Sequence, residues 1–163
     1  MTLASAGWTV AGFEMAGLAG MLVGGWLTDR YFRGRAAHVC VFSMILCGAT
    51  ILVFRELPRE APTWLTIGTL MMAGFFIYAP QALVGIAAAN LATKKAAATA
   101  VGLTGIFGYA STILSGWGLG TLVQHYGWAY GFGAMVVAAV IGAFVFALAW
   151  GAPSHGYGKL AAA

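Results

Sequence analysis

The chain has 163 residues, of which 61% are hydrophobic and only 7% are charged, and its formal net charge is +4. A soluble domain carries about 25% charged residues, so this composition excludes an ordinary soluble globular domain and indicates that lipid surrounds most of the chain. One membrane crossing takes about 20 apolar residues, and the apolar runs of this sequence add up to about five crossings.

Five apolar segments follow one another along the chain, separated by short joints that carry charges or turn residues. We expect transmembrane helices at about 7–28, 37–54, 64–91, 97–124 and 128–150, followed by a tail at 151–163. The strands of a transmembrane β-barrel alternate apolar and polar residues for about ten residues, whereas these runs are continuous and about twice as long. The predicted fold class is therefore an all-α integral membrane protein.

The Lys and Arg residues divide unequally between the two sides of the membrane that these segments define. One side holds Arg30, Arg33, Arg35, Lys94, Lys95 and Lys159, and the other holds Arg55 and Arg59. Since cytoplasmic loops are enriched in Lys and Arg, we expect the C-terminus to be cytoplasmic and the N-terminus to lie outside. The net positive charge then follows from topology, and nucleic acid is not an expected partner because no basic face or binding motif accompanies the charge.

Glu14, in the first segment, is the only acidic residue inside an apolar run. An intramembrane carboxylate is costly enough to be treated as functional by default, so one interpretation is a proton or ion-pair site in the wall of a cavity. The other is a carboxylate near the outer end of its helix that bonds to neighbours or reaches water. For the first interpretation we expect its partner on helices that this chain lacks.

The joint at 29–35 begins with Asp29, at the end of the first helix, where the negative end of the helix dipole disfavours a carboxylate. We therefore expect a partner for Asp29, either an Arg of the same loop or the amino end of a neighbouring helix, and a role as a gate latch. The alternative is a solvated, charged loop that only sets topology.

The third segment contains Tyr78, Pro80 and Gln81. Pro80 removes an intrahelical hydrogen bond and bends the helix, which predicts a hinge. Tyr78 and Gln81 are three residues apart and share a helix face, so they can present a hydroxyl and an amide to a substrate. A tyrosine that only packs in the bundle is the alternative.

The fourth segment carries glycines at close spacing, and small residues of this kind let helices approach and slide. The predicted packing positions are Gly102, Gly105, Gly108, Gly116 and Gly120. Lys94 and Lys95, which precede this segment, are expected either to set topology or to attract anionic substrates.

No pattern for covalent chemistry is present in the sequence. Cys40 and Cys47 are seven residues apart in one predicted helix, too far for a disulfide, and are expected to be free. The three His residues form no ligand set, and the sequence contains no nucleophile elbow or HExxH motif. We predict no enzyme activity, no metal site and no cofactor.

The joint after the first segment resembles the G-x-x-x-D-[RK]-x-x-[RK]-G-[RK] cytoplasmic loop signature of major facilitator superfamily transporters. Its matching residues are Gly25, Asp29, Arg30, Arg33, Gly34 and Arg35. The runs FEMAGLAGMLVGGW, GFFIYAPQALVG, LATKKAAATAVGLTGIFGY and YGW are similar to the C-terminal half of the organophosphate:phosphate antiporter family. That family includes glycerol-3-phosphate, hexose-phosphate and phosphoglycerate transporters and a hexose-phosphate sensor. The resemblance covers residues 7–150, nearly the whole chain.

The resemblance implies that the chain is a fragment, five helices of a six-helix C-terminal half in a bacterial inner membrane, with Tyr78 and Tyr109 lining the central cavity. Such transporters exchange an organophosphate for inorganic phosphate by alternating access. They hold phosphate with two arginines, one from the first helix of each half, and this chain contains neither helix. We therefore expect a partial transporter that needs the missing N-terminal helices and is not competent alone.

Two other functions remain open from the sequence. Some relatives are receptors, so the chain can be part of a sugar-phosphate sensor whose partner is a membrane kinase. It can also be an inert truncated remnant.

Overall fold

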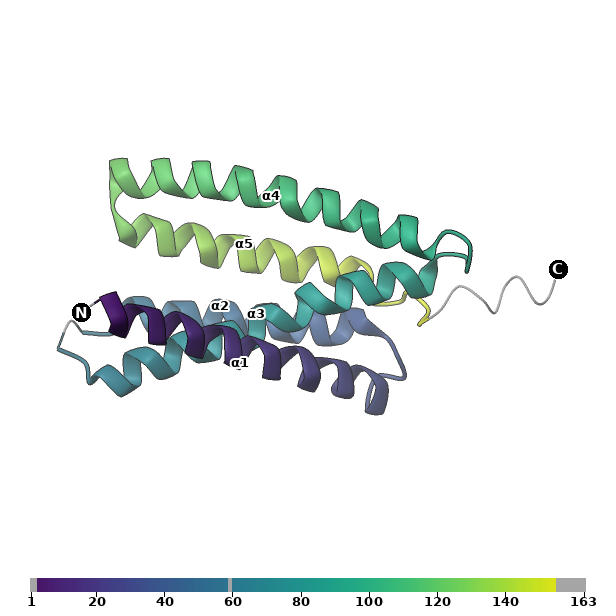
Figure 1. Ribbon diagram of the computed structural model, residues 1–163, viewed down its shortest axis with the longest axis horizontal. Helices are drawn as coiled ribbons and strands as arrows, with labels where there is room; N and C mark the ends of the chain where they lie inside the picture. Colours follow the sequence, from purple (N-terminus) through teal and green to yellow (C-terminus); the bar gives the residue numbers. More distant parts are fainter. Residues whose placement is uncertain (1–2, 59, 155–163) are drawn as a thin grey trace.

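The computed structural model describes residues 3–58 and 60–154, with side chains from Ala6 onward, and this part of the chain forms five α-helices (Figure 1). Their bounds are α1 Leu3–Arg30, α2 Ala36–Glu56, α3 Thr63–Leu91, α4 Ala97–Tyr126 and α5 Trp128–Leu148. All five helices are long and apolar enough to cross a membrane. The predicted all-α membrane fold is confirmed, and Arg59, His155 and Lys159 lie outside the described residues.

The helices extend beyond most of the segments that hydropathy suggests. The first helix continues past Thr28 to Arg30, the second past Phe54 to Glu56, and the fourth past Gln124 to Tyr126. Polar residues at these ends lower the mean hydropathy of the segment. The helix nevertheless continues there, because its further turns satisfy backbone N–H and C=O groups by hydrogen bonds. The fifth helix instead ends at Leu148, where Ala149 and Trp150 donate backbone hydrogen bonds of 3.0 Å in a tighter turn.

The helices run alternately up and down along the long axis of the molecule (Figure 1). The connection from α1 to α2, the connection from α3 to α4 and the carboxyl end of α5 lie at one end of the bundle, and the other two connections lie at the opposite end. The first end thus collects Arg33, Arg35, Lys94 and Lys95, whereas Arg55 lies at the other. This asymmetry is the one on which the predicted orientation depends.

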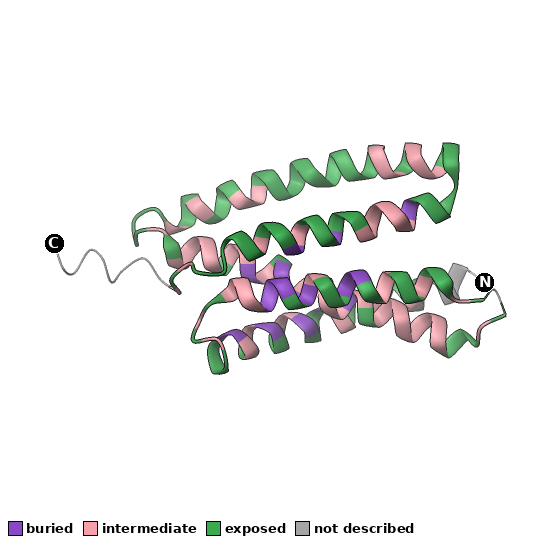
Figure 2. Ribbon diagram, turned by 180° about the vertical axis from the view of Figure 1, so that it is seen from behind, coloured by how far each residue is buried: buried purple, intermediate pink, exposed green. Residues whose placement is uncertain are grey.

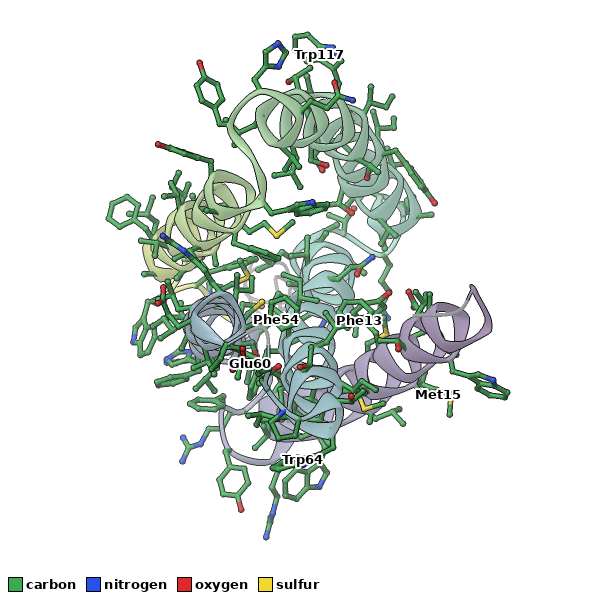
Figure 3. All side chains as sticks on the ribbon, turned by 90° about the vertical axis from the view of Figure 1, so that its left-hand side faces the viewer. Phe13, Met15, Phe54, Glu60, Trp64 and Trp117 are labelled. Atoms are coloured by element: carbon green, nitrogen blue, oxygen red, sulfur yellow. The ribbon has the colours of Figure 1, made fainter. Side chains whose placement is uncertain are left out.

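Helix α3 lies at the centre and packs against α1 and α2, while α2 also packs against α5. The small core contains Val39, Cys40 and Leu83, and both cysteines are free and buried, as predicted. Helix α4 has the weakest packing and no buried residue (Figure 2). In the end-on view, Trp117 of α4 and Met15 of α1 point away from the bundle (Figure 3). Large apolar side chains are exposed on every helix, so lipid or further helices must cover them.

The closest helix contact joins α1 to α3 and depends on glycines. A Cβ added at Gly20 would overlap the carbonyl oxygen of Phe75, and one at Gly24 would lie 2.7 Å from Ala79 Cβ. Gly20 and Gly24 form a G-x-x-x-G pair, which is the sequence signal for a close helix crossing. This pair lies on α1, whereas the packing glycines predicted from the sequence lie on α4.

Candidate functional site

Glu14 has its partner within this chain. The Tyr78 hydroxyl, on α3, donates a hydrogen bond of 2.5 Å to Glu14 Oε2, on α1. A donor at this distance meets part of the hydrogen-bonding demand of an intramembrane carboxylate, and hydrogen bonds to ionised groups are among the strong ones. The expectation that the partner of Glu14 must come from absent helices is therefore wrong for this contact.

Pro80 is buried within α3. The side chains of Tyr78 and Gln81, which precede and follow Pro80 in the sequence, lie on different sides of α3. Tyr78 turns toward α1, whereas Gln81 is exposed and lines a cleft on the α4 side. The sequence predicts that these two side chains act together on one face. In the structure they divide between two neighbouring helices.

The cleft between α3 and α4 has a volume of about 610 Å³ and is also bounded by Met44 and Phe146. Its polar lining residues are Gln81, Thr104, Tyr109, Ser111 and Thr112. Tyr109, one of the predicted cavity residues, is 79% exposed. Gln81 and Tyr109 therefore line the same cleft, which is what their predicted roles as cavity residues require.

The hydroxyl groups in this cleft differ in whether their protons are free. Thr104 donates to the Val101 carbonyl at 2.7 Å, and Ser111 and Thr112 both donate to the Gly108 carbonyl. Among the described residues, no hydrogen bond engages the Gln81 amide or the Tyr109 hydroxyl. These two groups are the available donors for an oxygen-rich ligand, and the cleft has no charged lining residue.

The 29–35 joint forms a tight turn after α1. Arg33 and Gly34 have positive φ angles of 52° and 79°, and the Gly34 N–H donates to the Thr28 carbonyl at 2.9 Å. Asp29, Arg30, Arg33 and Arg35 are all exposed. The four charged side chains at the end of α1 and in this turn are therefore exposed to solvent.

Asp29 and Arg35 also line a cavity of about 250 Å³ with Gly25, Asn90 and Ser154. In the part of the chain that the structure describes, the one ion pair is Arg55–Glu56 at 3.7 Å, so the expected partner of Asp29 is not found there. The latch role of Asp29 remains a prediction.

Within residues 3–58 and 60–154, the glycines predicted to pack on α4 show no close helix approach. A Cβ added at any of them would meet nothing within 4 Å; they are Gly102, Gly105, Gly108, Gly116 and Gly120. Their packing role stays a prediction that concerns other helices.

The fold and the site together define a class of protein. A bundle of five membrane-spanning helices that contains a hydrogen-bonded carboxylate and a cleft with two free donors has the features of a polytopic solute-transport domain. The chain belongs to the Major Facilitator Superfamily, whose sequence model matches residues 1–162.

Individual proteins with similar sequences give a more specific comparison than the superfamily. The chain is 40% identical over 149 residues, 90% of its length, to a "Probable hexose phosphate transport protein" of Chlamydia pneumoniae. It is 36% identical over 82% of its length to a "Glycerol-3-phosphate transporter" of Haemophilus influenzae and 34% identical over 88% to the "Membrane sensor protein UhpC" of Salmonella typhimurium. These matches cover 32%, 31% and 32% of the three relatives, so the chain spans about a third of their length.

Proposed function

We propose that this chain forms five helices of the C-terminal half of a secondary transporter that exchanges an organophosphate for inorganic phosphate across a bacterial inner membrane. The observation that carries the proposal is the α3–α4 cleft, where Gln81 and Tyr109 present free donors in a membrane-spanning bundle. The names of the relatives support a phosphorylated sugar or glycerol phosphate as the organophosphate.

The charge of the cleft limits what the chain does alone. A phosphate ester is an anion, and burying an anion away from water requires a charged partner as well as hydrogen bonds. Among the residues that the structure describes, neither an Arg nor a Lys lines the cleft. The cations that hold phosphate therefore come from helices outside this chain, and the five helices are not competent for exchange by themselves.

Within the assembled transporter, each part of the chain has a separate task. Gln81 and Tyr109 donate hydrogen bonds to phosphate or hydroxyl oxygens, and the Glu14–Tyr78 bond joins α1 to α3 across the wall of the pathway. The exposed glycine face of α4 packs against the other half, and the charged turn with Asp29 latches it at the cytoplasmic side. Alternating access then follows from rocking of the two halves around the site.

The test uses the chain expressed together with the part of the chlamydial relative that precedes its matched region, reconstituted in proteoliposomes loaded with phosphate. We expect exchange of labelled phosphate for external sugar phosphate. We expect Tyr109→Phe combined with Gln81→Leu to weaken it at least about fivefold, because two neutral hydrogen bonds together contribute about 1–3 kcal/mol. Trp117→Phe, on the outward face of α4, is the matched control and should leave exchange unchanged. Exchange that is insensitive to the double variant would refute the assignment of the cleft.

A sensor is the second candidate function, because the similarity to a membrane sensor protein nearly equals that to the transporters. A sensor in the same assembly would bind sugar phosphate without exchanging phosphate. An inert remnant would do neither.

A further inference from the structure

We propose that Gly17 and Phe13 are positioning residues that fix the ring of Tyr78 so that its hydroxyl reaches Glu14. This inference rests on the proposed function only for the meaning of the Glu14–Tyr78 bond in the transport pathway. The geometry itself belongs to this chain.

The first observation is the contact between the Tyr78 ring and the backbone at Gly17. A Cβ added at Gly17 would lie 2.7 Å from Tyr78 Cγ, 2.8 Å from Cδ2 and 3.0 Å from Cδ1. Because both Cδ atoms are nearly equidistant from this point, the base of the ring lies face-on against α1. Any side chain at this position would displace the ring.

A comparison with Gly12, on the same helix, shows why this contact is specific. A Cβ at Gly12 would overlap only the terminal methyl of Met71, whose Sδ and Cγ lie 3.8 Å and 3.9 Å away. A flexible methionine can turn its methyl aside. The rigid tyrosine ring has no such freedom, so the absence of a side chain at Gly17 determines where Tyr78 lies.

Phe13 fixes the ring from a second direction. Its ring meets that of Tyr78 edge-on, with centroids 5.9 Å apart and an interplanar angle of 76°. Figure 3 shows Phe13 directed from α1 toward α3, where a Cβ at Gly74 would lie 2.8 Å from its Cδ2. Phe13, Glu14 and Gly17 are spaced so that they share one face of α1.

The consequence concerns the single proton of the Tyr78 hydroxyl. With the ring held between Gly17 and Phe13, that proton is donated to Glu14 and not to the α3–α4 cleft. Tyr78 then donates its hydrogen bond to the Glu14 carboxylate, while Gln81 and Tyr109 are available to donate to a ligand in the cleft.

The test is solid-state NMR of the chain in lipid bilayers, with tyrosine labelled at ¹³Cζ, the carbon that bears the hydroxyl. Loss of one resonance in Tyr78→Phe assigns the Tyr78 signal. Glu14→Leu, which removes the acceptor, gives the displacement of this signal when the hydrogen bond is absent. We expect Gly17→Ala to displace the signal in the same direction by about half as much or more, because the charge-assisted bond is broken. Gly7→Ala, where a Cβ meets nothing within 4 Å, should leave it in place.

Phe13→Leu keeps the apolar volume but removes the aromatic edge, and we expect a smaller displacement in the same direction. If Gly17→Ala does not fold, the displacement of the signal in Phe13→Leu is the measurement that tests the proposal. The proposal is overturned if Glu14→Leu moves the signal while Gly17→Ala and Phe13→Leu leave it unchanged, or if Glu14→Leu itself has no effect. Since this readout needs no transport, its failure would leave the proposed function to be tested separately by phosphate exchange.

Discussion

The α1–α3 crossing predicts a large effect of one methyl group. In Gly20→Ala the new Cβ would overlap the Phe75 carbonyl oxygen and lie 2.8 Å from its carbonyl carbon and 3.0 Å from its Cα. All three atoms belong to the backbone, so no side-chain rotation relieves the contact. Restoring ordinary contact of 3.4 Å to the carbonyl carbon alone takes about 0.6 Å, and the carbonyl oxygen, which overlaps the new Cβ more deeply, requires the two helices to move further apart still.

The expected cost follows from two opposing effects. Overpacking of this kind costs about 1–3 kcal/mol, whereas replacing a helical glycine by alanine gains up to about 1 kcal/mol. Gly25→Ala on the same helix measures the gain alone, because its Cβ meets nothing within 4 Å. We therefore expect Gly20→Ala to be less stable than Gly25→Ala by about 2 kcal/mol.

The assay is the free energy of unfolding of each variant in bicelles, titrated with a denaturing detergent and followed by tryptophan fluorescence. Equal stability of Gly20→Ala and Gly25→Ala would refute the close crossing of α1 and α3.

Three further predictions concern the same helices and their ends. The Glu14→Leu and Tyr78→Phe variants, each of which removes one partner of the hydrogen bond, should show a coupling free energy of about 1 kcal/mol in a double-mutant cycle; additive effects would contradict that bond. Gly34→Ala should cost about 1–2 kcal/mol of unfolding free energy, since φ is 79° there; unchanged stability would argue against the left-handed turn. His38→Phe should raise the unfolding free energy by about 1 kcal/mol, because it removes the buried, unbonded Nδ1 and keeps the ring contact with Trp150; destabilisation would show that Nδ1 has a partner in the bilayer.

The number and type of the helices could be predicted from the sequence because each apolar run is continuous and long enough to cross a bilayer. The same hydropathy misplaced several helix ends, since Arg30 and Glu56 are polar and yet continue the backbone hydrogen bonding of α1 and α2. The composition of a segment indicates whether lipid or water surrounds it, whereas the end of a helix is determined by where its backbone hydrogen bonds stop.

The candidate site was harder to predict than the fold. Residue type identified Glu14 and Tyr78 separately, but a contact between residues 64 positions apart depends on how α1 crosses α3. That crossing is set by Gly20 and Gly24, whose spacing is visible in the sequence. The division of Tyr78 and Gln81 between two neighbours could not be read from helical periodicity alone. Residues three apart share a broad helix face but differ in direction by about 60°, which is enough for Tyr78 to reach α1 while Gln81 lines the cleft beside α4.

The proposed function requires an uncharged wall supplied by this chain and cationic helices that come from elsewhere. The most direct measurement is phosphate exchange in proteoliposomes that hold the chain alone, the preceding part of the chlamydial relative alone, or both together. We expect exchange driven by external sugar phosphate only when both are present. Exchange by the chain alone would contradict this expectation, because the α3–α4 cleft would then hold phosphate without a cation.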